Sequence, residues 1–370
     1  MDGKRILRQS SGLVPSEAEG QKANLRMVAW ELTRSCNLAC RHCRASSKYG
    51  PYPGELTAGE CFKVIDDIAS FSAPIVILTG GEPLLRKDVF RIAEYGKAKG
   101  LVMVMAPNGT LLNDENINKI IASGIKRISV SLDGPDAGSH DNLRQVPGAF
   151  KQACEGIGRA KDAGLEFQIN TTVTKRNIGL LPQVMKLAKD LGARAHHIFL
   201  LVPTGRAREM AGEELSASGY EETLKFLAEE KKRSSLEIKA TCAPHFNRVL
   251  LQDHAYTASS LAGRGCMAAV SFCFISHAGD VQPCGYLEIK CGNIRRRGFK
   301  DIWFESEVLN NIRDWGKYEG KCGACEFRSV CGGCRARAHV KYKNYLGEEP
   351  YCAYEPLKKA ARQNQAEPAG

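Results

Sequence analysis

The sequence lacks any long hydrophobic run, and this absence limits what the protein can be. No stretch approaches the ~18 consecutive apolar residues of a membrane-spanning helix, and the opening residues MDGKRILRQSSG contain no apolar core of a signal peptide. The chain also lacks a basic helix with interleaved aromatic side chains, although Lys and Arg exceed Asp and Glu by 11. We therefore expect a cytoplasmic protein with no membrane span and no nucleic-acid partner.

Signatures of hydrolytic catalysis are also missing, because no serine, histidine and aspartate pattern and no paired carboxylates stand out. Cysteine, in contrast, is abundant, with 15 residues in a chain of 370. An odd number without a secretion signal favours binding of metals or clusters over disulfides. The distribution agrees, since three cysteines lie at 36–43 and nine lie at 266–352.

The first half of the chain alternates between strand-like and helix-like segments. The expected strands are 28–33, 74–79, 101–106, 127–132, 167–173 and 196–202, and the expected helices between them are 58–70, 87–97, 114–122, 150–163 and 180–191. Six such repeats predict an α/β fold with a parallel sheet, helices on its outer face and an active site at the carboxyl ends of the strands. Periodicity alone does not distinguish a partial barrel from an open doubly wound sheet.

The alternation is predicted to stop after a helix at 220–232, which suggests a division into parts. We expect an N-terminal arm at 1–24, a core domain at 25–235, a bridge at 236–262, a cysteine-rich domain at 263–356 and a tail at 357–370. Cys242 and His245 lie within the bridge, and the sequence assigns neither a role.

Cys36, Cys40 and Cys43 follow the first predicted strand with the spacing C-x3-C-x2-C. A 4Fe-4S cluster takes four thiolates when it only carries electrons, so three thiolates suggest a cluster with one iron left open. An open iron is a binding site. Structural thiols or a zinc site remain the alternatives on spacing alone.

Gly80, Gly81 and Glu82 end the second predicted strand. Glycines allow close approach of backbone groups to a ligand, and a carboxylate can accept hydrogen bonds from an ammonium group. Asn108 follows the third strand, Ser131 lies in the fourth, and Arg144 lies in the loop beyond. Ordinary turn chemistry explains Asn108 equally well, because Asn-Gly is a standard turn dipeptide.

The three-cysteine motif, with Gly80-Gly81-Glu82 about one strand later, resembles the radical S-adenosylmethionine (SAM) enzymes. The resemblance implies a partial (β/α)6 TIM-like barrel and a cluster whose open iron binds SAM. It also implies the cofactor contacts: Gly80, Gly81 and Glu82 at the SAM amino group, Ser131 and Arg144 at its carboxylate and ribose, His42 against the adenine, and Asn108 as a further contact. A stray loop imidazole is an alternative for His42.

The C-terminal cysteines resemble the SPASM extension of these enzymes. The pattern is Cys266-x12-Gly279-x4-Cys284, then Cys322-x2-Cys325-x5-Cys331-x2-Cys334, then Cys352. Family members usually have three residues between the last two cysteines of the middle group, where this chain has two. The resemblance implies two auxiliary 4Fe-4S clusters, the first on Cys266, Cys284 and Cys334 and the second on Cys322, Cys325, Cys331 and Cys352. Zinc ribbons usually space their pairs farther apart, by ~15 to 20 residues.

The first auxiliary cluster then lacks a fourth ligand, and Cys273 is the expected one. It lies between Cys266 and Cys284, in the interval where relatives with two full clusters place the extra thiolate. With this ligand the protein would hold three 4Fe-4S clusters, one that binds SAM and two auxiliary clusters that carry electrons. The alternative is that Cys273 is a small buried residue of the predicted strand 272–275 and that this iron is open for substrate.

Five segments resemble the haem-biosynthesis branch of the family, in particular its iron-coproporphyrin III decarboxylases. The segments are 29–36 with 43–46, 105–110, 273–277 with 283–286, and 331–337. The resemblance implies oxidative decarboxylation of two propionate side chains to vinyl groups, giving haem b, with a tetrapyrrole substrate, a low-potential electron donor such as ferredoxin or flavodoxin, and an electron acceptor.

Anionic propionates favour guanidinium partners, so we expect Arg206 and Arg208, just after the sixth strand, to contact substrate. Three other functions remain open. They are a siroheme-derived tetrapyrrole deacetylase or haem d1 enzyme, a peptide-modifying radical SAM/SPASM enzyme, and a non-enzymatic electron carrier or zinc protein.

Overall fold

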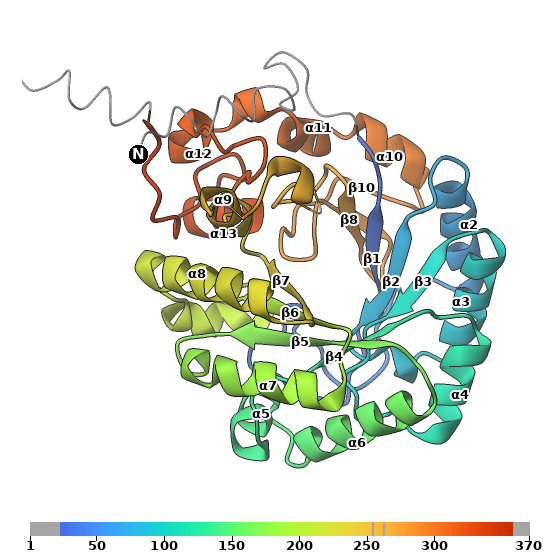
Figure 1. Cartoon of the computed structure of the whole chain (residues 1–370). Coiled ribbons are helices and arrows are strands. Elements are labelled where there is room, and N and C mark those ends of the chain that lie inside the picture. Colours follow the sequence, from blue (N-terminus) through green and yellow to red (C-terminus); the bar gives the residue numbers. More distant parts are fainter. Residues whose placement is uncertain (1–22, 254, 262, 358–370) are drawn as a thin grey trace, which may run out of the picture.

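A single curved sheet runs through the computed structural model, which describes residues 23–253, 255–261 and 263–357 (Figure 1). Its described strands are β1 Met27–Thr33, β2 Ile75–Gly80, β3 Val102–Met105, β4 Ile128–Ser131, β5 Phe167–Val173, β6 Ala195–Leu200, β7 Glu237–Thr241, β8 Phe272–Ile275, β9 Asp280–Gln282 and β10 Gly292–Asn293. They follow the order β10-β9-β8-β1-β2-β3-β4-β5-β6-β7. Strands β1 to β7 pair in parallel, β8 joins β1 in parallel, and β9 and β10 are antiparallel additions.

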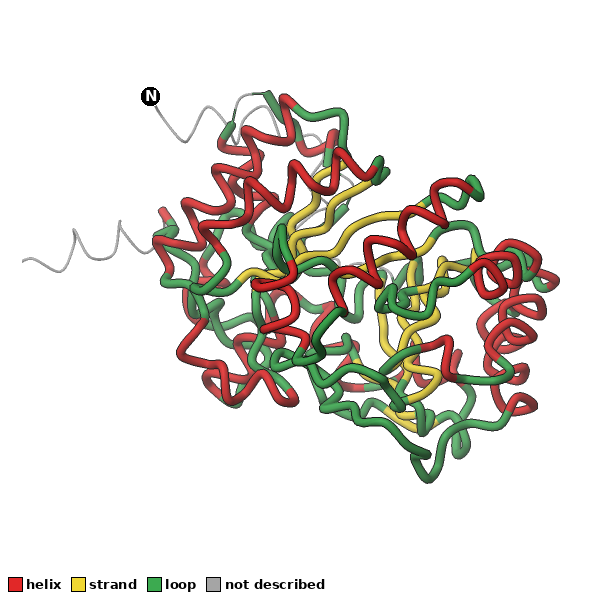
Figure 2. The backbone as a smooth tube through the Cα atoms, turned by 90° about the horizontal axis from the view of Figure 1, so that it is seen from below, coloured by secondary structure: helices red, strands yellow, loops and turns green. Residues whose placement is uncertain are grey.

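Helices cover the outside of the curved sheet, as Figures 1 and 2 show from two directions. The described α-helices are α2 Ala58–Ala69, α3 Val89–Ala98, α4 Asp114–Ala122, α5 Ala137–Arg144, α6 Ala149–Asp162, α7 Leu181–Leu191, α8 Ala217–Arg233, α9 Phe246–Gln252, α10 Phe299–Glu305, α11 Glu307–Arg313, α12 Gly320–Ala324 and α13 Arg335–Tyr342. Short 3-10 helices include η1 Pro83–Leu85 and η3 Gly205–Glu213. The predicted partial (β/α)6 barrel, with a small C-terminal iron-sulfur domain, is confirmed.

Strand β1 shows how the sequence separates the two faces of the sheet. Side chains alternate along a strand, so Val28, Trp30 and Leu32 share one face and belong to the main hydrophobic core with residues of α2. Glu31 and Thr33 share the opposite face. A buried carboxylate on that inner face, where parallel strands end, marks the inside of the barrel as the polar and functional side.

The segment 236–262, predicted to be a bridge, is instead partly a strand. β7 pairs in parallel with β6 from Ala195 and Glu237 to Phe199 and Thr241. Among its five residues only Ile238 is buried, because β7 is the last strand of the sheet and has a neighbour on one side. A single buried position gives almost no periodic signal, so the pattern was too weak to predict this strand.

The C-terminal part is joined to the barrel through main-chain pairing. β8 pairs with β1 from Met27 and Phe272 to Trp30 and Ile275, so the hairpin β8–β9 continues the barrel sheet beyond its first strand. The predicted boundaries between a core domain at 25–235 and a cysteine-rich domain at 263–356 stay a prediction. In the described residues, one sheet crosses that division.

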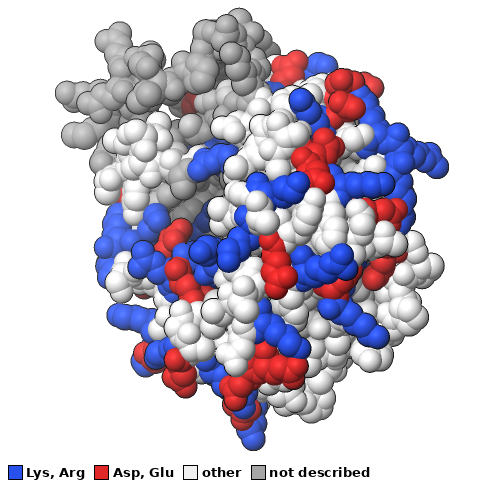
Figure 3. All heavy atoms as spheres, turned by 90° about the vertical axis from the view of Figure 1, so that its right-hand side faces the viewer, with Lys and Arg blue, Asp and Glu red and all other residues white. Residues whose placement is uncertain are grey.

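The helices and the surface charge bear on the expectations about membranes and nucleic acid. No helix among the described residues is both long and apolar enough to cross a bilayer. On the face where α2, α3 and α4 lie, acidic and basic side chains are interspersed (Figure 3). Pairs such as Lys99 with Asp66 and Lys119 with Glu115 contribute to this mixture.

Candidate active site

The cysteine loop follows β1 and packs directly on the Gly80-Gly81-Glu82 segment after β2. A Cβ atom added at Gly81 would lie 2.3 Å from the carbonyl oxygen of Ser35, so this contact requires glycine. The backbone N–H groups of Gly81 and Glu82 donate to the carbonyls of Thr33 and Ser35, each at 2.8 Å. Gly80 is equally tight, with its hypothetical Cβ 2.3 Å from the oxygen of Thr33.

The thiols of Cys36, Cys40 and Cys43 lie near one another and near hydrogen-bond donors. The N–H of Leu38 donates to Cys36 Sγ and the N–H of Ser47 donates to Cys43 Sγ, both at 3.4 Å. Burial raises the pKa of Cys36 to about 12, and Cys40 and Cys43 add to the rise because their charges are close.

The environment of these thiols fits a cationic iron cluster. Buried thiols with raised pKa values stay protonated without a metal, while a positive cluster stabilises the thiolates and N–H donors stabilise the sulfur charge. Arg144 Nη1 donates to Cys40 Sγ at 3.6 Å.

Glu82 is fully buried beside the cysteine loop. Its Oε2 accepts from the N–H of Asn108 at 2.7 Å, and its Oε1 accepts from the N–H of Leu84 at 3.0 Å. Burial raises its pKa to about 7. An uncompensated buried carboxylate next to Cys36 is suited to a cationic ligand, as the resemblance predicts for the SAM amino group.

Asn108 braces the cysteine loop through its side chain. Its Nδ2 donates to Asn37 Oδ1 at 2.8 Å, and Asn37 Nδ2 donates to Thr110 Oγ1 at 2.8 Å. Asn108 Oδ1 also accepts from the N–H of Thr110 at 2.9 Å, which fits the turn explanation offered by the sequence. A direct contact with cofactor stays a prediction.

Arg144 lies at the end of α5, a helix that the sequence did not predict, and not in a loop. Its guanidinium is nearly buried and forms an ion pair with Asp133, while its other end reaches Cys40. Burial opposes ionisation of Asp133, but Arg144 and His42 hold its pKa below the usual value. The predicted role of Arg144 at the SAM carboxylate stays a prediction beside this structural one.

His42 belongs to the cysteine loop, and Ser131 is the last residue of β4. His42 Nε2 is 3.8 Å from Asp133 Oδ2, and its Nδ1 is buried without a hydrogen-bond partner. Burial lowers the pKa of His42 to about 4, so the ring is neutral near neutral pH. Ser131 ends β4 opposite Asn170 of β5. The predicted adenine and carboxylate contacts of His42 and Ser131 stay predictions.

Arg206 has a structural role in addition to the predicted substrate contact, which stays a prediction. Its Nε donates to the carbonyl of Cys40 at 2.8 Å, and its Nη1 donates to the carbonyl of Ser47 at 2.6 Å. The carbonyl of Cys43 accepts from the backbone N–H of Arg206 at 3.0 Å. Arg206 therefore clamps the cysteine loop, and the sequence could not show this because the two segments are about 160 residues apart.

Arg208 lies on the surface. Its side chain is 67% exposed and forms an ion pair with Glu288 at 2.7 Å. A contact between Arg208 and substrate stays a prediction.

The sequence missed a buried network on the inner face of β1. Glu31 is fully buried, and its carboxylate accepts from Arg44 Nη2 at 2.5 Å and lies 2.8 Å from His277 Nδ1. Burial works to raise the pKa of Glu31, but Arg44, His277 and Arg34 hold it at about 2. The only sequence signal was a glutamate within an apolar strand.

This network joins the cysteine loop to the C-terminal hairpin. Arg44 lies over the ring of Phe274, with 4.4 Å between guanidinium carbon and ring centroid. Burial raises the pKa of Tyr286 far above its usual value, and the charged groups acting on it are Cys242, Arg44, Cys284 and Cys43. Tyr286 therefore lies between the cysteine loop and a second group of thiols.

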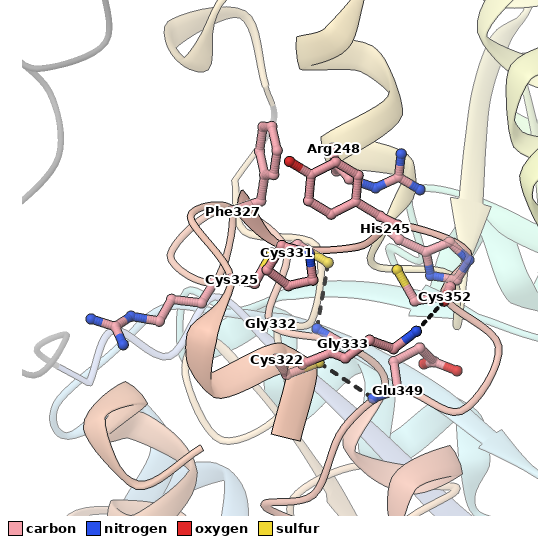
Figure 4. A pocket seen from close by; sticks show the side chains of 14 residues that line it. His245, Arg248, Cys322, Cys325, Phe327, Cys331, Gly332, Gly333, Glu349 and Cys352 are labelled. Atoms are coloured by element: carbon pink, nitrogen blue, oxygen red, sulfur yellow. Dashed lines mark hydrogen bonds between the residues drawn. The ribbon is translucent and has the colours of Figure 1, made fainter. Parts of the chain in front are cut away.

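Cys322, Cys325, Cys331 and Cys352, which the resemblance implies as the ligands of one cluster, line one pocket (Figure 4). The N–H of Glu349 donates to Cys322 Sγ at 3.3 Å, and the N–H of Gly333 donates to Cys331 Sγ at 3.5 Å. Cationic Arg248, Lys321 and Arg328 are further lining residues. Four thiols with N–H donors and surrounding positive charge fit a closed 4Fe-4S cluster.

Cys266, Cys284 and Cys334 form a separate neighbourhood, and their shared role as cluster ligands stays a prediction. Each of Cys266 and Cys334 acts electrostatically on Cys284, whose pKa burial raises to about 12. The shorter spacing before Cys334 therefore does not displace it from this group.

Cys273 does not join that group, contrary to the prediction. In β8 it lies opposite Val28, on the helix-covered face that carries the main core, and it is fully buried. The neighbouring Phe274 lies on the opposite face and contacts Arg44. Besides burial, only Cys291 and Arg313 act on the Cys273 thiol. The alternative interpretation of Cys273 as a small buried strand residue fits this position.

Arg337 links the two groups of C-terminal thiols. Its Nη1 lies 3.0 Å from both carboxylate oxygens of Glu349, and Glu349 Oε2 accepts from the N–H of Cys334 at 2.8 Å. The side chains of Arg337 and Glu349 are each 1% exposed. Cys322 of one group and Cys334 of the other therefore contact the same glutamate.

Comparison with known proteins relates this geometry to families. The chain matches the radical SAM superfamily over residues 30–188 and the SPASM iron-sulfur cluster-binding domain over residues 266–326. It is 48% identical over 351 residues to the AdoMet-dependent heme synthase of Nitratidesulfovibrio vulgaris, with 92% of this chain and 96% of the relative covered. The pre-heme d1 synthase of Dinoroseobacter shibae is 31% identical, with 88% and 85% covered.

Among solved structures, Streptococcus suis SuiB bound to S-adenosylmethionine has the same fold. Its TM-score is 0.73 at 14% sequence identity, and the match covers 95% of this chain and 81% of SuiB.

Proposed function

This chain belongs to the haem-biosynthesis branch of the radical SAM enzymes and carries a SPASM domain, and from that premise we propose that it converts iron-coproporphyrin III into haem b. Two propionate side chains would each become a vinyl group. The support for this reaction is the 48% identity, over nearly its whole length, to a protein named AdoMet-dependent heme synthase. The chain is only 31% identical to a pre-heme d1 synthase, so the haem d1 alternative has weaker support than haem b formation.

The proposed reaction balances without an acid or base from the protein. For each propionate, a hydrogen atom leaves the β-carbon, the bond to the carboxylate carbon breaks, CO2 departs and one electron passes to an acceptor. SAM bound to a reduced cluster supplies the 5′-deoxyadenosyl radical that takes the hydrogen atom. The protein holds and orients the groups and keeps water away.

We assign the roles of the chain as follows. Cys36, Cys40 and Cys43 hold the SAM-binding cluster, and Glu82 accepts from the SAM amino group. A low-potential donor such as ferredoxin or flavodoxin would reduce the SAM-binding cluster. Two auxiliary clusters on the C-terminal thiols would pass the electron from each decarboxylation to an electron acceptor. The substrate would lie near Tyr286 and Arg44, because these side chains lie between the cysteine loop and the auxiliary thiols.

An anaerobic assay tests the proposal. Purified protein, SAM, a reductant and iron-coproporphyrin III should give a product that has lost CO2 and two hydrogens per propionate, read by mass spectrometry, with two 5′-deoxyadenosine molecules per haem. Turnover of didecarboxysiroheme with loss of acetate side chains, and none of coproporphyrin, would instead make the protein a deacetylase.

Iron content tests the cofactor assignment separately. Loaded protein should hold about twelve irons per chain, and alanine at Cys36, Cys40 and Cys43 together should leave about eight irons and no 5′-deoxyadenosine. Reductive SAM cleavage by that triple variant would contradict the assignment.

A further inference from the structure

We propose that Cys242 is the fourth thiolate ligand of the first auxiliary cluster and completes a closed set with Cys266, Cys284 and Cys334. The inference rests on the proposed function, because it assumes that this part of the chain holds an auxiliary cluster. It replaces Cys273, which the spacing had suggested.

The electrostatic surroundings of Cys242 are those of the other three thiols. The titratable and charged groups close enough to act on the Cys242 thiol are Cys334, Cys284, Arg337 and Cys266. Three of these four are the residues already assigned to the cluster. No other cysteine outside the two C-terminal groups has such neighbours among the described residues.

Main-chain contacts place Cys242 independently of its charge. Arg337, three residues after Cys334, donates from Nη2 to the carbonyl of Cys242 at 2.7 Å. On the other side, Gly265 lies so close to Pro244 that a Cβ at Gly265 would be 2.4 Å from the Pro244 oxygen. The turn that carries Cys242 is thus held between the segments that carry Cys266 and Cys334.

The conformation of this turn agrees with a fixed side chain. Cys242 follows β7 with φ of 56°, a left-handed conformation that residues other than glycine seldom adopt. Outliers of this kind gather at functional sites, where the surrounding structure holds them.

The same turn also reaches the second cluster pocket. His245, three residues on, lines that pocket and is 1% exposed, and neither of its ring nitrogens has a hydrogen-bond partner in the described structure. The segment 242–245, whose role could not be assigned from the sequence, therefore lies between the two groups of thiols.

A four-iron cube accommodates this arrangement better than a single ion. No three His, Cys, Asp or Glu side chains in the described residues converge closely enough to share one metal ion. A 4Fe-4S cluster binds one thiolate per corner, so its ligands lie farther apart than those of one zinc ion. Four thiolates leave no open iron, so substrate would not bind this cluster directly.

The test uses a parent that lacks the SAM-binding cluster, with alanine at Cys36, Cys40 and Cys43, because the open iron of that cluster would also bind added ligands. In this parent we compare Cys242→Gly and Cys242→Ser with Cys273→Ala, a matched loss of a buried thiol. Glycine suits the left-handed backbone at position 242, so Cys242→Gly should fold. Iron and sulfide content and the electron paramagnetic resonance of the reduced clusters are measured with and without cyanide.

We expect the parent and Cys273→Ala to hold about eight irons and to show spectra that cyanide does not change. Cys242→Gly should either fall to about four irons or keep eight with a spectrum that cyanide alters. Cys242→Ser should keep its iron with shifted resonance positions, because oxygen replaces sulfur.

Three outcomes would overturn the proposal: a cyanide-sensitive parent, a Cys273→Ala variant that loses iron, or Cys242 variants identical to the parent. A second measurement guards against misfolding. In the loaded parent, iodoacetamide should leave the half-buried Cys242 unmodified until a chelator removes the iron, and modification before that step would also overturn the assignment. Neither measurement uses a tetrapyrrole, so failure of the proposed decarboxylation is a separate result.

Discussion

Glu82 is a buried carboxylate whose charge is useful only when a cation binds beside it. Its folded-state pKa of about 7 lies above the usual 4.5, so the neutral form is favoured by folding. Stability from this group is complete below pH 4.5 and is lost as the pH rises to about 7. The loss amounts to about 3 kcal/mol, at 1.36 kcal/mol per pH unit.

We therefore predict that Glu82→Gln separates stability from cofactor binding. Denaturant unfolding of the cluster-free protein should show that, as the pH rises from about 4.5 to about 7.5, the free energy of unfolding of the variant increases by about 3 kcal/mol relative to that of wild type. The variant also loses one backbone hydrogen bond, which lowers its free energy of unfolding by about 1 kcal/mol at every pH. Calorimetry on the loaded protein should show SAM binding weakened roughly 10- to 100-fold. Equal pH dependence of the two proteins would show that Glu82 is not the buried group we describe.

Arg337 and Glu349 form a buried ion pair whose loss leaves a charge without compensation. Glu349→Gln should lower the free energy of unfolding by about 3–5 kcal/mol, because Glu214 at 3.6 Å would be the remaining carboxylate partner of the buried Arg337 charge. Iron content should fall as well, since Glu349 contacts both Cys334 and Cys322.

The matched control is Glu115→Gln, which removes an exposed pair with Lys119 in α4. It should change stability by less than about 1 kcal/mol and leave the iron content unchanged. Similar effects of the two substitutions would mean that the buried pair contributes no more than a surface pair.

Spacing along the chain predicted the residues that lie close together because they are close in sequence. Cys36, Cys40 and Cys43 share one loop. Cys322, Cys325 and Cys331 lie within ten residues of one another and line the same pocket. Cys242 and Cys273 show where this reasoning ends. The face on which a strand residue lies depends on pairing with a strand more than 240 residues earlier, and no local pattern gives that information.

At the scale of elements, the contact between the cysteine loop and the strand β2 depends on two glycines. We predict that Gly81→Ala lowers SAM cleavage at least tenfold and destabilises the protein by about 1–3 kcal/mol, because its methyl group would overlap the Ser35 carbonyl at 2.3 Å. Initial rates of 5′-deoxyadenosine formation and chemical unfolding measure the two effects.

Gly158→Ala serves as the control for this substitution. Gly158 lies inside α6 with nothing within 4 Å of a new methyl group, so alanine there should stabilise the helix by about 0.5–1 kcal/mol and leave SAM cleavage unchanged. If both glycine variants behave alike, backbone packing at Gly81 does not position the loop.

Elements with several buried residues at regular spacing were predicted within a few positions, and others were missed. Helix α2 buries Cys61, Val64, Ile65 and Ile68 on one face, which gives a clear helical pattern. Helix α5 buries only His140, Leu143 and Arg144, of which two are polar, so hydrophobic periodicity could not reveal it. The sequence therefore predicted the layers of the barrel and missed the short helix that carries Arg144.

At the scale of the whole molecule, the two predicted domains share one sheet and one core. β8 pairs with β1 along four residues, and the main core includes Ile275, Ile302 and Trp303 from the C-terminal part together with Val28 and Trp30. This continuity fixes the auxiliary thiols relative to the cysteine loop, as electron transfer between fixed sites requires.

We predict that the barrel does not fold without the C-terminal part. A chain ending at residue 262 would lose nine fully buried core residues, Ala269, Cys273, Ile275, Val281, Leu287, Ile302, Trp303, Leu309 and Ile312. At about 1.5–3 kcal/mol for each large apolar side chain, the loss approaches or exceeds the typical total stability of about 5–15 kcal/mol. It would also expose the edge of β1 to pairing with other chains.

Size-exclusion chromatography and near-ultraviolet circular dichroism of the truncated chain should show aggregates without fixed aromatic packing. Co-expression of residues 263–370 as a separate chain should restore a folded, iron-loaded pair. A truncated chain that stays monomeric and still binds a SAM-cleaving cluster would show that the barrel is an independent domain after all.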